Sequence, residues 1–228
     1  MKTKLLILFV VLLINPISNY GQNTNNESCN ADSKIINVPE GNGKQVTSDG
    51  VFSKGEWDDA LKYTIADNFD IYMKADSEIL YIGLKSAEPI SQFGCEIRIT
   101  SDEKEVFLLH VSGALAEGVS DFPATAKFEV NNNIFWEANY CKADPEKKAA
   151  WIEAGKPIEK SDMMYERKDG IEFKIYRKKF TDSSLKFTIG WIQVDIKGNQ
   201  IDKKTYNYPT NATLENADNW VELILPEI

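Results

Sequence analysis

Apolar and polar residues alternate over two neighbouring segments in the first half of the chain. Every second residue from Phe69 to Met73 is apolar, and the same holds from Leu80 to Leu84. A period of two is typical of β-strands that bury one face. Residues 75–78, with the sequence Ala-Asp-Ser-Glu, have the chemistry of a turn, so the pattern predicts a β-hairpin.

Further hairpins are predicted in the middle of the chain. Residues 92–100 and 105–112 are strand-like and are joined by a polar turn at residues 101–104. Residues 126–130 and 134–140 flank three consecutive asparagines, which tolerate left-handed backbone and predict another turn. Successive hairpins favour antiparallel sheets, so the expected fold class is all-β, an antiparallel β-sandwich.

One segment between the strands has the features of a helix. Asp144 is suited to cap its first turn, Pro145 to occupy the first helical position, and Gly155 to end it. We therefore expect a short helix inserted on the rim of the sandwich.

The start of the chain predicts a secretory signal peptide over residues 1–21. Lys2 and Lys4 precede an unbroken apolar run at residues 5–14. This run is too short for a helix that spans a bilayer, which needs about 20 residues, and it has the order of a signal sequence. A buried first helix is the alternative.

The mature chain is expected to be one domain with a flexible leader. Residues 22–45 begin with a stretch rich in Asn, Gln and Ser that has little to bury. Residues 46–228 are long enough for one sizeable core. Cys29 follows polar residues instead of the apolar residues of a lipid-attachment site, so we expect a secreted or periplasmic protein without a membrane anchor.

The net negative charge of the chain disfavours polyanionic partners. The chain has 26 basic and 35 acidic residues, and loss of Lys2 and Lys4 with the signal leaves a net charge of about −11. Nucleic acids and anionic membranes need a cationic face to displace their counterions, so neither is an expected partner.

The cysteines leave two alternatives open. Cys95 and Cys141 lie in strand-like segments, where export permits a disulfide bond between them, and two buried free thiols are the alternative. The single histidine disfavours a Cys/His metal site. The acidic surplus would allow a structural calcium ion, although no loop has the spacing of a calcium site. No cofactor is expected otherwise.

Three groups of motifs occur in order from residue 46 to the end of the chain. The first contains an Asp-Gly turn, a Glu-Trp dipeptide and the hairpin of residues 69–84. The second combines residues 169–175 and 187–195 as paired late strands, and the third is a closing strand at residues 219–223. Together they resemble the family 9 carbohydrate-binding modules and the related DOMON domains. The resemblance implies a secreted β-sandwich that holds a sugar or, in some DOMON members, haem.

Aromatic residues are the candidates for a sugar site. Sugar rings present apolar faces that stack on flat aromatic rings, while amide, carboxylate and Arg groups bond the hydroxyls. Trp57 and Trp220 lie in the motif segments and are expected to pack in the core. The predicted ligand wall and its polar partners are Trp136, Trp151, Tyr140, Trp191, Arg98 and Gln193. Burial in the core is the alternative for each aromatic residue.

The expected function is non-catalytic binding of an oligo- or polysaccharide. His110 lies in a strand-like segment and is predicted to be a packing residue, and no carboxylate pair stands out for glycoside hydrolysis. Two other functions stay open. One is docking onto another protein of the cell envelope, and the other is haem binding with Met73, His110, Met163 or Met164 as an axial ligand.

Overall fold

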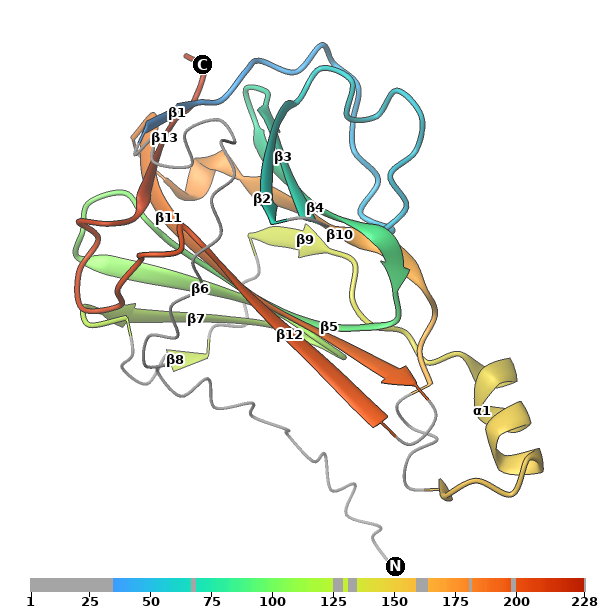
Figure 1. Ribbon diagram of the computed structural model, residues 1–228. Helices are drawn as coiled ribbons and strands as arrows, with labels where there is room; N and C mark the ends of the chain where they lie inside the picture. The colour runs from blue at the N-terminus through green and yellow to red at the C-terminus, as the bar shows by residue number, and fades with distance from the viewer. Residues whose placement is uncertain are drawn as a thin grey trace, which may run out of the picture. The chain divides into compact units, whose positions relative to one another are not determined.

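The computed structural model describes residues 35–66, 69–124, 129–130, 135–158, 164–180, 182–197 and 200–227. These residues form two β-sheets that pack face to face, together with a short α-helix (Figure 1). The predicted signal peptide, Cys29 and Met163 lie outside the described residues.

The five-stranded sheet has the strand order β2-β3-β4-β10-β9. Its strands are β2 (Leu61–Ala66), β3 (Phe69–Ala75), β4 (Ile79–Ile90), β9 (Trp136–Ala138) and β10 (Lys168–Tyr176). β3 and β4 confirm the predicted hairpin. Asp76 closes the turn between them, because its carboxylate accepts hydrogen bonds from the backbone N–H groups of Glu78 and Ile79.

The eight-stranded sheet has the order β1-β13-β11-β5-β6-β7-β8, with β12 paired to β11. Its strands are β1 (Ile35–Asn37), β5 (Gln92–Thr100), β6 (Glu105–Val111), β7 (Leu115–Asp121), β8 (Glu129–Val130), β11 (Ser184–Lys197), β12 (Gln200–Tyr208) and β13 (Val221–Ile224). The two sheets confirm the predicted β-sandwich, and β5 with β6 confirms the second hairpin. The sheet is not wholly antiparallel, because β1 pairs with β13 in parallel.

Two predicted pairings are wrong. The asparagine-rich segment does not join two strands of one hairpin: β8 pairs with β7, whereas β9 pairs with β10 in the other sheet. The two late motif strands also lie apart, since β10 pairs with β4 and β11 pairs with β5. In both places the chain passes from one sheet to the other, which a local alternation of residues does not reveal.

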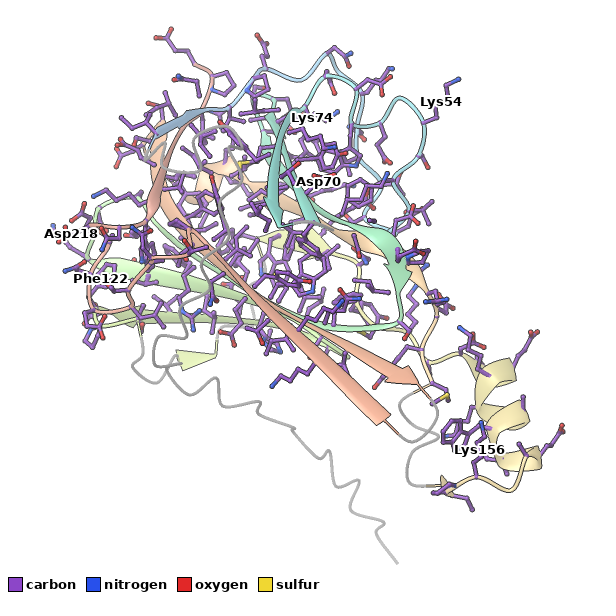
Figure 2. All side chains as sticks on the ribbon, in the orientation of Figure 1. Lys54, Asp70, Lys74, Phe122, Lys156 and Asp218 are labelled. Carbon is purple, nitrogen blue, oxygen red and sulfur yellow. The ribbon has the colours of Figure 1, made fainter. Side chains whose placement is uncertain are left out.

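The core lies between the two sheets, where side chains gather (Figure 2), and many of its residues occur at every second position of a strand. Along β5, Cys95, Ile97 and Ile99 are at most 1% exposed and belong to this core. Because side chains alternate across a strand, Glu96 and Arg98 point to the outer face of the eight-stranded sheet.

The domain extends further toward the N-terminus than predicted. Ile36 in β1 and Val38 just after it are buried in the core, and Val38 donates its backbone N–H to the Ile224 carbonyl at 2.9 Å. Part of the predicted leader of residues 22–45 is therefore a strand of the sheet.

The inserted helix is confirmed as α1 (Pro145–Glu153), between β9 and β10 in the chain. The Asp144 carboxylate caps it by accepting the backbone N–H of Lys147 at 3.0 Å, and Gly155 leaves it at a φ of 69°. A 3-10 turn, Arg177–Lys179, follows β10. Within the described part of the chain, no helix has both the length and the apolar character needed to cross a bilayer.

Candidate functional site

A row of five residues crosses the outer face of the eight-stranded sheet, one from each of five neighbouring strands. Strand register aligns Asn207, Gly190, Glu96, His110 and Ala116 side by side. We call this set the outer polar row. Within the row, Gly190 lies beside Glu96 and Ala116 lies beside His110. The carboxylate and the imidazole are therefore next to positions with little or no side chain.

Ion pairs and hydrogen bonds connect the centre of the outer polar row to residues beside it. Arg98 Nη2 lies 2.8 Å from Glu96 Oε2, and His110 Nδ1 lies 3.4 Å from Glu96 Oε1. On the far side of the imidazole, His110 Nε2 is 3.1 Å from Ser112 Oγ. Arg98 also donates from Nε to the Ala124 carbonyl at 3.4 Å.

These groups are partly exposed to solvent. The side chains of Arg98, Glu96 and His110 are 13%, 17% and 33% exposed, respectively. Burial acts to raise the pKa of Glu96, but the hydrogen bond from His110 and the charge of Arg98 outweigh it and leave this pKa below its ordinary value. Glu96 is therefore an ionised carboxylate at neutral pH that solvent still reaches.

The aromatic wall predicted from the sequence does not form as expected. Trp136 and Trp191 are 2% and 1% exposed, and both belong to the core between the sheets. Trp136 stacks on Phe173, and Trp191 packs edge-on against Phe69. The apolar alternation of β9 and β11 turns both indoles inward, so neither is presented to a ligand at the surface.

The other two aromatic candidates lie in or near the helical insertion. Tyr140 is 39% exposed. Trp151 in α1 is half-buried, donates its indole N–H to the Pro157 carbonyl at 2.9 Å, and has the Lys156 ammonium 4.3 Å from its ring centroid. Lys156, which lies beside α1 (Figure 2), therefore covers one face of this ring.

The two polar candidates, Arg98 and Gln193, lie on opposite faces of the eight-stranded sheet. Gln193 shares the inward parity of Trp191 on β11 and is 8% exposed, whereas Arg98 lies beside the outer polar row. Of the six predicted residues, Arg98 is the one that the fold brings to this face. Sequence reasoning missed Glu96, although its position two residues before Arg98 on a strand is the signal that would place both on one face.

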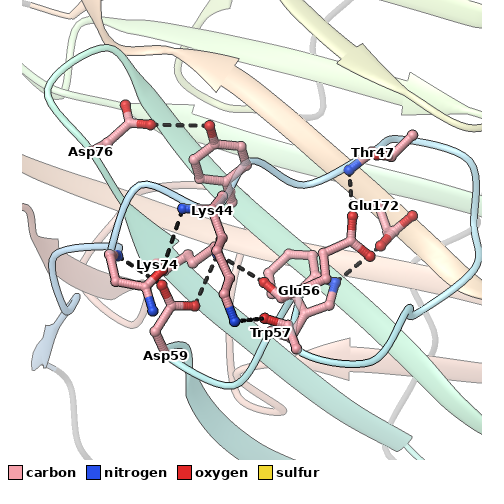
Figure 3. A network of polar contacts seen from close by, with 11 residues as sticks. Lys44, Thr47, Glu56, Trp57, Asp59, Lys74, Asp76 and Glu172 are labelled. Atoms are coloured by element: carbon pink, nitrogen blue, oxygen red, sulfur yellow. Dashed lines mark hydrogen bonds and ion pairs between the residues drawn. The ribbon is translucent and has the colours of Figure 1, made fainter.

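A second polar cluster fixes the segment around the Glu-Trp dipeptide (Figure 3). The fully buried Lys74 ammonium donates to the carbonyls of Lys44 and Glu56 at 2.9 and 2.8 Å, and to Asp59 Oδ1 at 2.9 Å. Burial acts to raise the pKa of Asp59, but the backbone N–H of Asn42 and the Lys74 ammonium lower it below its ordinary value. This cluster is internal and anchors the loop before β2.

Glu172 of β10 anchors the Asp-Gly turn of the same segment. Its carboxylate accepts the Gly50 backbone N–H at 2.9 Å and the Trp57 indole N–H at 3.0 Å (Figure 3). Burial raises the pKa of Glu172 to about 7, against the effect of these two donors, and Glu56 and Asp49 raise it further by their charge. Trp57 is 6% exposed, so its predicted packing role is confirmed.

We expect Glu172 to make the fold less stable as pH rises. Because its folded pKa is raised, its contribution to the free energy of unfolding is present below its ordinary pKa and is lost as pH rises through about 7. In urea unfolding, this contribution should fall by roughly 2 kcal/mol between about pH 5 and about pH 8. Glu172→Gln, which cannot ionise, should remove that part of the pH slope, and an unchanged slope would contradict the assignment.

Cys95, Cys141 and Met73 occupy structural positions in the core. Cys95 and Cys141 are buried free thiols, and Cys141 Sγ bonds the backbone of Phe93, so the structure has no disulfide between them. Met73 is fully buried in the core, and His110 is held by Glu96 and Ser112. Among the described residues, no group of three or more His, Cys, Asp or Glu side chains is placed to hold a metal ion.

Among the comparisons with known proteins, the search of solved structures is the one that finds matches. No protein-family model matches the chain, and no curated protein sequence matches it. Two solved structures of a family 9 carbohydrate-binding module from Caldicellulosiruptor kristjanssonii match, one in complex with cellotriose and one with glucose. Each is 13% identical and covers 85% of this chain, with 94% and 96% of the module covered and a TM-score of 0.48.

Proposed function

We propose that this protein binds a carbohydrate at the outer polar row. The observation that carries the proposal is the alignment of Glu96 and His110 between residues with small side chains, on a sheet face that solvent reaches. Sugar hydroxyls both donate and accept hydrogen bonds, and they are recognised by a few convergent polar groups. The row and its neighbours supply a carboxylate, a guanidinium, an imidazole and, from Asn207, an amide.

The groups of the row are held in place before any ligand arrives. Arg98 and His110 hold the Glu96 carboxylate from two sides, and this carboxylate is ionised at neutral pH. Preorganised charged acceptors make stronger hydrogen bonds than neutral ones, and less side-chain entropy is lost on binding. The resemblance of the sequence motifs to carbohydrate-binding modules supports the ligand class, and the strand register supports this position for the site.

The experiment is retention of the mature protein on glycan arrays and on polysaccharide affinity gels. Glu96→Gln removes the charge while keeping the shape, and we expect it to weaken binding at least about tenfold, since one charge-assisted hydrogen bond contributes about 1.5–3 kcal/mol. Glu153→Gln, the same change at an exposed position of α1, is the matched control and should bind like wild type. Equal retention of both variants would contradict a site at the row, and retention on no glycan would contradict carbohydrate binding.

A stacking contribution from aromatic residues is a separate part of the proposal. With Trp136 and Trp191 buried, it rests on Trp151 and Tyr140. Trp151→Ala should lower retention if its ring meets the sugar. Loss in Trp151→Ala together with full retention in Glu96→Gln would place the ligand at the helical insertion instead of the outer polar row.

We further propose that the protein is exported and that residues 1–21 are removed. The support is the order of Lys2, Lys4 and the apolar run at residues 5–14. N-terminal sequencing of protein from the extracellular or periplasmic fraction should begin near Gln22, and an intact Met1 in that fraction would contradict cleavage.

Docking onto another protein is a second candidate function, and the helical insertion favours it. α1 has no buried residue, and Ile152 and Ile158 are 42% and 68% exposed. Large apolar side chains exposed on an inserted element are candidates for contact with a partner protein. Ile152→Ser with Ile158→Ser should abolish capture of a protein partner while leaving glycan retention intact, and an unchanged capture would remove this candidate.

A further inference from the structure

Two members of the outer polar row, Glu96 and His110, form a chain of contacts with the neighbouring Ser112 that binding alone does not require. A carboxylate, an imidazole and a hydroxyl follow one another: Glu96 Oε1 is 3.4 Å from His110 Nδ1, and His110 Nε2 is 3.1 Å from Ser112 Oγ. This is the connectivity by which a serine is activated as a nucleophile, with an acid that orients a base and a base that faces the hydroxyl.

Strand geometry builds this arrangement. Glu96 and His110 are cross-strand partners on β5 and β6, and Ser112 follows His110 by two residues, just beyond the end of β6. Residues two apart on a strand lie on one face, so the sheet brings all three groups to its outer side. The chain places them in the order acid, histidine, serine.

The contact with Glu96 selects the tautomer of a neutral imidazole that can act as a base toward Ser112. An ionised Glu96 accepts a hydrogen bond, so the proton of a neutral His110 is held on Nδ1 and Nε2 is left as an acceptor for the Ser112 hydroxyl. Arg98, on the other oxygen of Glu96, keeps that carboxylate in its place. His110 and Ser112 are half-buried, so a reagent can reach the hydroxyl.

We propose that Ser112 is a nucleophile that accepts acyl groups from esters, with His110 as its general base and Glu96 as a positioning residue. The substrate class is a small acyl ester, and an O-acyl group on a sugar hydroxyl is the form that the proposed function would bring to this face. Ester hydrolysis is a reaction in addition to binding. Reactivity of Ser112 is therefore tested separately from retention on glycans.

The reaction balances with water as the second substrate. Ser112 Oγ bonds to the ester carbonyl carbon as its proton passes to His110 Nε2, and that proton then leaves with the alcohol as the ester C–O bond breaks. Water attacks the acyl-serine, gives one proton to His110, and releases the carboxylic acid while Ser112 regains its hydrogen.

Two groups of the kind that stabilise an oxyanion lie near Ser112, namely the Gly113 backbone and the Tyr165 side chain. Gly113 follows the nucleophile in an exposed bend, and a Cβ built on it would lie 3.9 Å from the hydroxyl of Tyr165. Backbone N–H groups and tyrosine hydroxyls are the donor types that stabilise a tetrahedral intermediate.

The first experiment treats the folded protein with a fluorophosphonate, which forms a stable bond with an activated serine hydroxyl and releases fluoride. Peptide mass spectrometry should place the adduct on Ser112. His110→Asn should slow labelling about a hundredfold, the usual contribution of a general base. Ser77→Ala, at an exposed serine in the β3–β4 turn, should label like wild type. The same variants are tested for hydrolysis of p-nitrophenyl acetate.

The second experiment isolates the role of Glu96. Since the chain has one histidine, its imidazole nitrogens give unambiguous signals in ¹H–¹⁵N spectra. Wild type should show the proton on Nδ1, and Glu96→Gln should raise the share of the Nε2–H form and slow labelling, with Glu96→Asp restoring both in part. A serine adduct absent from Ser112, labelling that His110→Asn leaves unchanged, or a proton on Nε2 in wild type would each overturn the proposal.

Discussion

Lys74→Met will destabilise the fold by about 3–5 kcal/mol, the usual cost of removing one partner from a buried ion pair. The Lys74 side chain is 0% exposed and its ammonium has three oxygen acceptors, namely Asp59 and the carbonyls of Lys44 and Glu56. Methionine keeps most of the volume but leaves these oxygens in the interior without their cation. Equilibrium urea unfolding measures the loss.

A lysine in a neighbouring strand provides the control for Lys74. Lys62 in β2 pairs with Asp70 at 2.9 Å, but its side chain is 50% exposed. Lys62→Met should change the free energy of unfolding by no more than about 0.5 kcal/mol, because exposed ion pairs contribute little. If both variants lost a similar amount of unfolding free energy, the burial of Lys74 would not be the reason for its contribution to stability.

Gly170→Ala will prevent β10 from pairing correctly with β4. A Cβ built on Gly170 would lie 2.0 Å from the carbonyl oxygen of Leu84 and 2.9 Å from its carbonyl carbon. Both atoms are backbone, so the strands would have to separate where they now pair, and we expect a loss of at least about 3 kcal/mol or no folded protein. Circular dichroism and urea unfolding of the purified variant test this.

Gly94→Ala is the matched control in the other sheet. A Cβ built on Gly94 meets no atom within 4 Å, and its backbone needs no positive φ. Alanine should therefore leave stability unchanged or raise it by up to about 1 kcal/mol through the lower entropy of the unfolded chain. A loss as large as that of Gly170→Ala would show that strand glycines matter here for a reason other than space.

Local patterns in the sequence were sufficient to predict much of the fold. The hairpin of β3 and β4 and the helix α1 depend on neighbouring residues, namely alternation, turn chemistry and capping by Asp144, and both are confirmed. The sheet to which each strand belongs depends on distant partners. For this reason the hairpin expected around the three asparagines is wrong, and β7, with Glu117 and Gly118 at its centre, was not predicted.

The candidate site was harder to predict, because it depends on register between strands. Trp136 and Trp191 were chosen by residue type, yet strand parity turns their rings into the core. Glu96, His110 and Ser112 have no motif in common, and they meet because β5 pairs with β6 in one register. A shift of that pairing by one residue would place the carboxylate beside a different residue of β6.

β13 lies between β1 and β11, so the first and the last strands of the domain are neighbours. During synthesis, the start of β11 (residues 184–187) must wait for residues 221–224 before its edge is covered, and β1 has no partner strand until the same residues leave the ribosome. The domain therefore completes this sheet only once residues 221–224 are available. Such a delay would suit the export proposed above, because a chain passes through a secretion channel in extended form.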